Sequence, residues 1–111
     1  MTPERITKYY NAICEAEKIK PLPLKFTRVG KGGACLTYNA LTLKPLYISI
    51  DLRVVDDVEY AVIHELTHQI KLLTEKNPYP GKKDQQKKFK KHENMLVEKY
   101  MYSKHTDLLW K

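Results

Sequence analysis

The sequence predicts a small α+β domain in which helices stack on a three-stranded sheet. Its 111 residues are 42% hydrophobic, which suits a single core and argues against disorder. Three long segments show helical periodicity, and three short segments between the first two alternate apolar and polar residues as strands do. The expected order is helix, three strands, helix, helix. Residues 1–111 therefore form one domain, without repeats or linkers.

The first helix is expected from Pro3 to about Lys20, because Pro21 and Pro23 follow and end it. Apolar residues recur along one side of it at helical spacing: Ile6, Tyr9, Tyr10, Ile13, Ala16 and Ile19.

Strands are expected at 24–29, 34–39 and 46–52, where apolar residues alternate with polar ones. A glycine-rich turn at 30–33 separates the first two. In the third strand one face is expected to consist of Leu46, Ile48 and Ile50, with Tyr47 on the other face.

A second helix is expected at 58–73, before the turn residues 77–81. Asp56 is expected to cap it, with Glu59 completing a capping box. The apolar stripe of this helix consists of Val62, Ile63, Leu66, Ile70 and Leu73.

The last long helix is expected from residue 84 to about residue 103. One side of it is expected to carry Phe89, His92, Leu96 and either Lys99 or Tyr100.

The sequence of residues 64–68, His-Glu-Leu-Thr-His, lies inside the second helix. Histidines four apart project from one helical face, which is the arrangement that two ligands of one Zn²⁺ need. Glu65 leaves the same turn and is placed to take a proton from a zinc-bound water. The alternative is an amphipathic helix in which His64 and His68 are ordinary solvated or core residues.

Catalytic zinc usually takes three protein ligands and keeps one position open. His92, in the next helix, is the expected third ligand. Its neighbour Glu93 replaces it if the helix is rotated by about 100°. A third ligand other than His92 and Glu93 also stays open. The alternative for His92 itself is that it is an ordinary surface histidine.

The net charge of +7 comes largely from one lysine-rich stretch. A solvated helix face is the preferred interpretation, and nucleic acid is not an expected partner, because no base-reading motif accompanies the charge. The lysines are Lys82, Lys83, Lys87, Lys88, Lys90 and Lys91.

Cys14 and Cys35 fit no zinc-ribbon or disulfide pattern, so both are expected to be reduced and buried. The N-terminus lacks the layout of a signal peptide, and no apolar run is long enough to span a membrane. The sequence therefore predicts a soluble, cytoplasmic protein without membrane insertion.

The order of elements and the motif at 64–68 resemble the gluzincin metallopeptidases, and most closely the minigluzincins. These are minimal soluble proteins of about this length, similar to catalytic domains of integral-membrane metallopeptidases. The same motif spelling occurs in thermolysin-like enzymes. Over nearly the whole chain, the resemblance implies a zincin-like fold: an N-terminal helix, a small twisted sheet with an antiparallel edge strand, the HExxH helix, and a helix carrying the third ligand. His92 replaces the usual gluzincin glutamate.

The resemblance also implies that residues 35–40 form the rim of the cleft and pair with the substrate backbone. Tyr38, Asn39 and Ala40 are the expected substrate contacts, because thermolysin-like enzymes use an asparagine-alanine pair there. An asparagine that begins a turn is the alternative for Asn39. Gluzincins often place an aspartate four residues after the third ligand. Leu96 holds that position here, so the partner of the zinc histidines comes from elsewhere or the register differs.

Minigluzincins are zymogens kept latent by their C-terminal segments, within one molecule or between two. By resemblance, residues 103–111 are expected to cover the cleft, with His105 or Asp107 near the zinc, and to support self-association. The alternative is that the apolar end of this segment completes the core: Leu108, Leu109 and Trp110.

These observations predict a zinc-dependent endopeptidase, isolated in an active or a latent form, that acts on a peptide or protein substrate. Zinc would polarise the scissile carbonyl, and Glu65 would move the proton from water to the leaving amine. A SprT-like protease acting on DNA-bound proteins is a competing enzyme. A non-catalytic zinc- or nucleic-acid-binding module is the other alternative. The oxyanion formed during cleavage needs a hydrogen-bond donor besides zinc. The sequence does not choose among four candidates: Tyr79, Tyr100, Tyr102 and His105.

Overall fold

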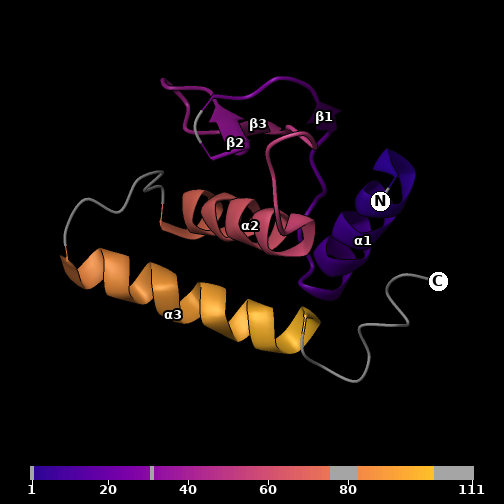
Figure 1. Cartoon of the computed structure of the whole chain (residues 1–111). Coiled ribbons are helices and arrows are strands. Elements are labelled where there is room, and N and C mark those ends of the chain that lie inside the picture. Colours follow the sequence, from indigo (N-terminus) through magenta and orange to yellow (C-terminus); the bar gives the residue numbers. More distant parts are fainter. Residues whose placement is uncertain (1, 31, 76–82, 102–111) are drawn as a thin grey trace.

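The computed structural model describes residues 2–30, 32–75 and 83–101. The predicted order of one helix, three strands and two helices is confirmed (Figure 1). The elements are α1 (Pro3–Ala16), β1 (Leu24–Phe26), β2 (Ala34–Tyr38), β3 (Pro45–Ile50), α2 (Val58–Glu75) and α3 (Lys83–Tyr100).

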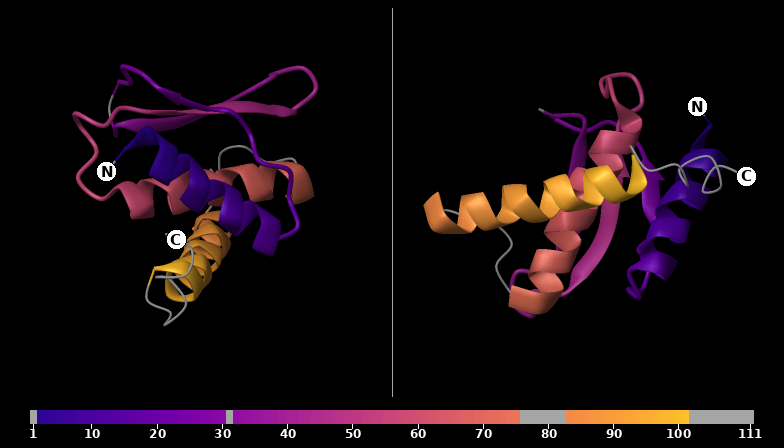
Figure 2. Two further views of the ribbon diagram at one scale, coloured as in Figure 1. Left: turned by 90° about the vertical axis from the view of Figure 1, so that its right-hand side faces the viewer. Right: turned by 90° about the horizontal axis from the view of Figure 1, so that it is seen from below.

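The three helices lie on one side of the sheet in two layers. Helices α1 and α2 face the sheet, and α3 crosses α2 on the side away from it (Figure 2). Helix α2 is therefore the central element, and it contacts β2, β3, α1 and α3. Within the described ranges, no helix combines the length and apolar character needed to cross a bilayer.

The sheet is mixed, with the strand order β1-β3-β2. Strand β1 pairs with β3 in parallel, and β2 pairs with β3 antiparallel, so that Leu36 lies opposite Ile48. This confirms the α+β class and the antiparallel edge strand. In the part of the chain that the structure describes, the outer edge of β2 has no strand beside it.

The prediction for one face of β3 was correct for Ile48 and Ile50, which are buried, and wrong for Leu46, which is 43% exposed. An irregularity in the pairing between Thr37 and Tyr38 sets Tyr38 opposite Pro45. This shift breaks the alternation of the strand, and Pro45 takes the buried position instead of Leu46.

Helix α1 ends at Ala16, earlier than the prolines predicted. Lys18 adopts a left-handed conformation with φ of 59°. The Ile19 N–H donates to the Cys14 carbonyl and the Lys18 N–H donates to the Glu15 carbonyl. This is a Schellman motif, which satisfies the last carbonyls of the helix without glycine.

Helix α2 begins at Val58, as predicted, but its cap is one residue later than the prediction. The Asp57 carboxylate, not that of Asp56, accepts the Tyr60 N–H at 3.0 Å. The stripe prediction was wrong for Leu73, which is 48% exposed, whereas Leu72 is buried. A central helix packs on several sides, so its burial does not follow a single stripe.

Helix α3 is rotated relative to the prediction. Its buried residues are Phe89, Glu93, Leu96, Val97 and Tyr100, and His92 is only half-buried.

The two cysteines differ from each other in burial. Cys14 is buried as expected, but Cys35 is exposed, because Leu36 takes the buried position in β2.

The segment between β3 and α2 is fixed by Asp51, which is buried. Its carboxylate accepts hydrogen bonds from the Val29 and Arg53 backbone N–H groups and from the Arg53 guanidinium. Its own N–H donates to the Gly33 carbonyl at 2.7 Å. Asp51 therefore connects the end of β3 to the loop between β1 and β2, which places residues 51–57 beside the start of β2.

Replacing Asp51 by asparagine is expected to lower the free energy of unfolding at neutral pH. The hydrogen bonds from Arg53, more than any other cause, hold the pKa of Asp51 at about 2. A folded-state pKa below the unfolded value of about 3.9 gives stability that is present above that value. This stability is lost as the pH falls toward 2. Urea denaturation of both proteins between about pH 2 and about pH 7 measures it.

The control is Asp56→Asn, because Asp56 is an exposed carboxyl group in the same segment. An Asp51→Asn protein whose stability falls with acid in the same way as the wild type would contradict this role.

Candidate metal centre

Helix α2 brings His64, Glu65 and His68 together, as the spacing predicted. Their potential ligand atoms all lie within 4.8 Å of one another. The ring centroids of the two histidines are 4.8 Å apart. Both histidines are half-buried, whereas Glu65 is only 4% exposed. The two imidazoles are therefore open to a ligand, and the carboxylate between them is shielded from bulk water.

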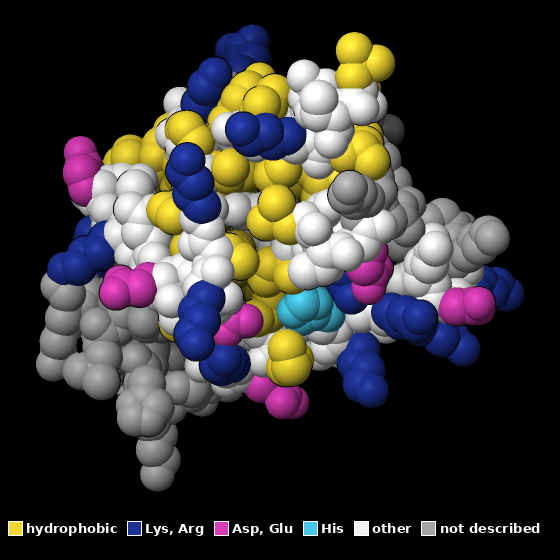
Figure 3. Space-filling model, turned by 180° about the vertical axis from the view of Figure 1, so that it is seen from behind, with side chains coloured by type: hydrophobic (Ala, Val, Ile, Leu, Met, Phe, Trp, Pro, Cys, Tyr) yellow, Lys and Arg dark blue, Asp and Glu magenta, His cyan; other side chains and the backbone are white. Residues whose placement is uncertain are grey.

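A cavity of about 730 Å³ lies between β2 and the N-terminal half of α2, and His64, Glu65 and His68 line it. Its size is in the range of ligand and substrate pockets. On the face drawn in Figure 3, histidine surface borders an apolar area. The apolar lining of the cavity comes from Ala34, Leu36, Tyr38, Val54, Val55, Tyr60 and Ala61.

Small residues keep this cavity open. Ala34 and Ala61 line it from opposite sides, on β2 and α2, and Gly32 lines it where the loop enters β2. The neighbouring Gly33 has a φ of 75°, and a Cβ atom there would lie 2.6 Å from the Val55 side chain. Only glycine therefore lets the residue 54–57 segment approach β2 this closely.

The Glu65 carboxyl group is buried without full hydrogen bonding. Its Oε2 atom has no hydrogen-bond partner among the described residues. Burial raises the pKa of Glu65 to about 7; the charge of Glu93 also raises it, while that of His64 lowers it. An incompletely paired carboxylate in a cavity is costly unless a ligand or a proton compensates it. Glu65 therefore has the properties of a residue that exchanges a proton.

Helix α3 forms the other side of the centre. The Phe89 ring lies 4.5 Å from the His68 ring and 5.5 Å from the His64 ring, measured between centroids. Phe89 is 8% exposed, so it shields the two imidazoles from water on this side. It also limits the rotation of both rings.

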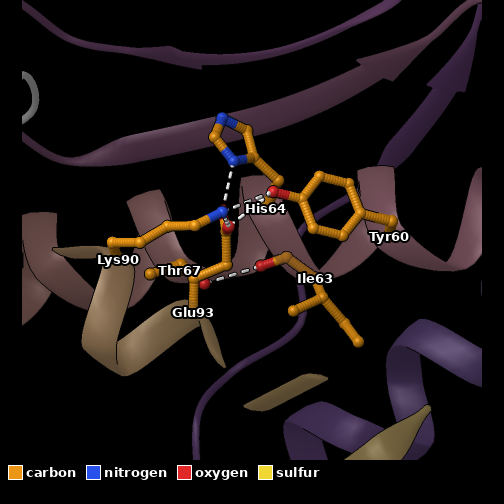
Figure 4. A network of polar contacts seen from close by, with 6 residues as sticks. All are labelled: Tyr60, Ile63, His64, Thr67, Lys90 and Glu93. Carbon is orange, nitrogen blue, oxygen red and sulfur yellow. Dashed lines mark hydrogen bonds and ion pairs between the residues drawn. The ribbon is translucent and has the colours of Figure 1, made fainter. Parts of the chain in front are cut away.

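Glu93 is the α3 residue that reaches His64 (Figure 4). Its Oε2 atom lies 2.5 Å from His64 Nδ1. Its Oε1 atom accepts the Tyr60 hydroxyl at 2.5 Å and the Lys90 ammonium at 2.9 Å. Burial works against the charge of Glu93, but the hydrogen bonds from Tyr60, Lys90 and His64 outweigh it and lower the pKa of this carboxyl group.

The structure does not bring His92, the predicted third ligand, to the centre. His92 is half-buried, and the charged groups that influence it are Lys71, Glu17 and Glu75. Burial, followed by the charge of Lys71, lowers the pKa of His92. The rotation of α3 thus directs Glu93 toward His64. Neither residue belongs to the group of three whose ligand atoms lie within 4.8 Å of one another.

Of the predicted substrate contacts, Tyr38 lines the cavity. The Asn39 side chain instead accepts the backbone N–H groups of Leu41 and Thr42, at 2.9 and 3.1 Å. It therefore stabilises the turn before β3, which is the alternative that the sequence left open. Ala40 is exposed in the same turn.

Among the oxyanion candidates, Tyr100 is buried and donates its hydroxyl to Glu17, so it is engaged outside the cavity. The other candidates lie outside the described residues: Tyr79, Tyr102 and His105. The same holds for Asp107 and for the whole segment 103–111 that the resemblance assigns to latency. The lysines 83, 87, 88, 90 and 91 are exposed on α3, as expected of a solvated helix face.

Sequence reasoning missed Tyr60 and Lys90. Tyr60 precedes His64 by four residues and Lys90 precedes Glu93 by three, so each shares a helical face with its partner. That spacing could have pointed to Tyr60 and Lys90 as neighbours of the site, but only once Glu93 is known to face α2.

The residues present fit a metal ion. Two imidazoles and nearby carboxylates are typical donors for zinc, and the free Oε2 atom of Glu65 lies beside them. Comparisons of the chain with protein-family models, with curated proteins and with solved structures gave no match.

Zinc analysis of purified variants is expected to separate the ligands from their neighbours. The wild type should hold about one zinc per chain, and His64→Ala and His68→Ala should hold none. His92→Ala should bind zinc like the wild type, because His92 lies outside the centre, and Glu93→Gln should bind it more weakly. Loss of zinc in His92→Ala with full retention in Glu93→Gln would identify His92 as the third ligand.

Proposed function

We propose that this protein is a zinc-dependent metallopeptidase that cleaves within peptide chains. The observation that supports it most is Glu65, a buried carboxyl group with one unpaired oxygen beside two histidines in a large cavity. A structural zinc site does not require such a group, because its metal is closed by four protein ligands. A gluzincin-type, zincin-like architecture and a latent form are parts of the same proposal.

Each residue has a role in this proposal. His64 and His68 would hold the zinc ion, and Glu93, which contacts His64, would be the third ligand in preference to His92. When bound, zinc supplies Lewis-acid polarisation of a carbonyl and increases the acidity of a water molecule. Glu65 takes the proton from the attacking water and passes it to the amine that leaves.

The surroundings suit an extended peptide. Strand β2 lies at the sheet edge beside the cavity, so its outward backbone groups can pair with a substrate as an added strand. The apolar lining of the cavity offers a site for a large apolar side chain of that substrate. Pairing to β2 would hold the backbone, and the cavity would select among side chains.

Glu65→Gln is expected to leave zinc bound and to reduce cleavage of fluorescent casein at least about a hundredfold, because the amide cannot accept the proton. Glu98→Gln, an exposed position on α3, is the matched control and should be unaffected. Unchanged cleavage by the Glu65→Gln protein would exclude the peptidase mechanism and favour a non-catalytic zinc-binding module.

Ala61→Leu is expected to reduce cleavage of the same substrate about tenfold or more, because the larger side chain fills the cavity. Zinc content should not change, since Ala61 has no ligand atom. Ala12→Leu, a half-buried position on α1, controls for general effects on packing. Equal cleavage by the Ala61→Leu variant and the wild type would show that the substrate does not enter this cavity.

A further inference from the structure

We propose that Tyr60 is a positioning residue that, with Lys90, holds Glu93 by one carboxylate oxygen and so presents the other oxygen to the metal. This inference rests on the proposed function, because it assigns Glu93 as a zinc ligand. It adds two residues whose side chains do not bind the metal themselves.

The two oxygens of Glu93 have separate partners. Oε1 accepts two hydrogen bonds, from the Tyr60 hydroxyl at 2.5 Å and from Lys90 Nζ at 2.9 Å. Oε2 contacts His64 Nδ1 at 2.5 Å. Figure 4 shows Tyr60 and Lys90 converging on the carboxylate end of Glu93, next to His64. Oε2 is paired with His64 Nδ1, so a metal ion bound by Glu93 would take the place of this contact and would meet one carboxylate oxygen only.

Helical spacing produces this arrangement. Tyr60, His64 and His68 are four residues apart and share one face of α2. The Tyr60 and His64 rings are 6.2 Å apart and inclined by only 25°. Tyr60 therefore lies beside the ligand on its own helix and donates to the ligand on the other helix. The Tyr60 side chain thus contacts both His64 on α2 and Glu93 on α3, across the interface between these helices.

Energetics favour a dominant role for Tyr60. Glu93 is 1% exposed, and a buried carboxylate needs hydrogen-bond donors to remain charged. The Lys90 side chain is 60% exposed, so solvent weakens its ion pair with Glu93. Tyr60 is half-buried, packs on the His64 ring and loses little conformational freedom in donating its hydrogen bond. Lys90 further anchors the hydroxyl, which lies 3.2 Å from its Nζ atom.

Positioning of this kind affects metal binding before any reaction begins. A glutamate side chain has several rotatable bonds, and fixing them in advance reduces the entropy lost when the metal binds. Removal of a hydrogen bond to a metal ligand typically lowers metal affinity by a factor of about 10 to 100. Tyr60 is thus expected to act on affinity and coordination.

The test measures zinc affinity by competition with a chelator, in the full chain, for the wild type, Tyr60→Phe and Tyr47→Phe. Tyr60→Phe keeps the ring but removes the hydroxyl, and it should weaken zinc binding by a factor of about 10 to 100. Tyr47→Phe, on β3 and outside the cavity lining, is the matched control and should bind zinc like the wild type. Thermal denaturation of the metal-free proteins checks that all three fold.

The visible absorption of bound Co²⁺ provides a readout that a purely structural role would not change. The loss of a fixed carboxylate should alter the Co²⁺ bands in Tyr60→Phe and leave them unchanged in Tyr47→Phe. Lys90→Met, at an exposed position, tests the second donor without disturbing the core and should weaken zinc binding in the same direction, by less than Tyr60→Phe does.

The outcomes separate the two proposals. Zinc affinity and Co²⁺ bands in Tyr60→Phe that equal those of the wild type would overturn the positioning role and leave the metallopeptidase proposal intact. A wild-type protein that binds no zinc would overturn both. Weaker zinc binding with altered Co²⁺ bands in Tyr60→Phe alone among the tyrosine variants would establish the role.

Discussion

Two buried carboxyl groups beside His64 constrain the rest of the site. Glu65 and Glu93 are 4% and 1% exposed; burial is the main cause that raises the pKa of Glu65, and the charge of Glu93 adds to it. Burying two carboxylates side by side is unfavourable without positive charge or hydrogen-bond donors. Glu93 meets this need through Tyr60, Lys90 and His64, whereas Glu65 retains an unpaired oxygen. A divalent cation held by the histidines would relieve this repulsion, which supports the proposed zinc site.

Local sequence signals predicted most of the fold. Periodicity identified all six elements, because amphipathic helices and half-buried strands repeat at different spacings. The motif at 64–68 predicted its own geometry, because residues four apart share one helical face whatever surrounds them. Where the predictions were wrong, tertiary contacts decided. A pairing irregularity turned Leu46 to solvent, and Leu73 is 48% exposed although it belongs to the predicted apolar stripe. The early end of α1 at Ala16 depends on a Schellman motif in which Lys18, not glycine, is left-handed, and sequence patterns rarely reveal this.

The third ligand shows the limit of the sequence most clearly. His92 and Glu93 differ by about 100° of helical rotation, so one step decides which of them faces α2. The inward positions of α3 run through Phe89, Glu93, Leu96 and Tyr100, with spacings of four, three and four. A search for an apolar stripe misses this row, because it contains Glu93, and glutamate is seldom buried without partners. The partners of Glu93 come from α2 and from Lys90, so only the packing of the two helices reveals why a charged residue occupies that position.

The cavity beside these residues is maintained at some cost to packing. Replacing Gly32, Ala34 and Ala61 by larger apolar residues would fill space that an ordinary small domain uses for its core. The chain instead fixes the surrounding segments in two ways: Asp51 holds the loop after β3 by hydrogen bonds, and Gly33 lets the Val55 side chain approach the start of β2. Walls held in this way suit the proposed role of the cavity as a site for part of an extended chain. Core and cavity occupy different places among the described residues. The core lies among α1, α2, α3 and the inner face of the sheet, and the cavity lies beside the edge strand β2.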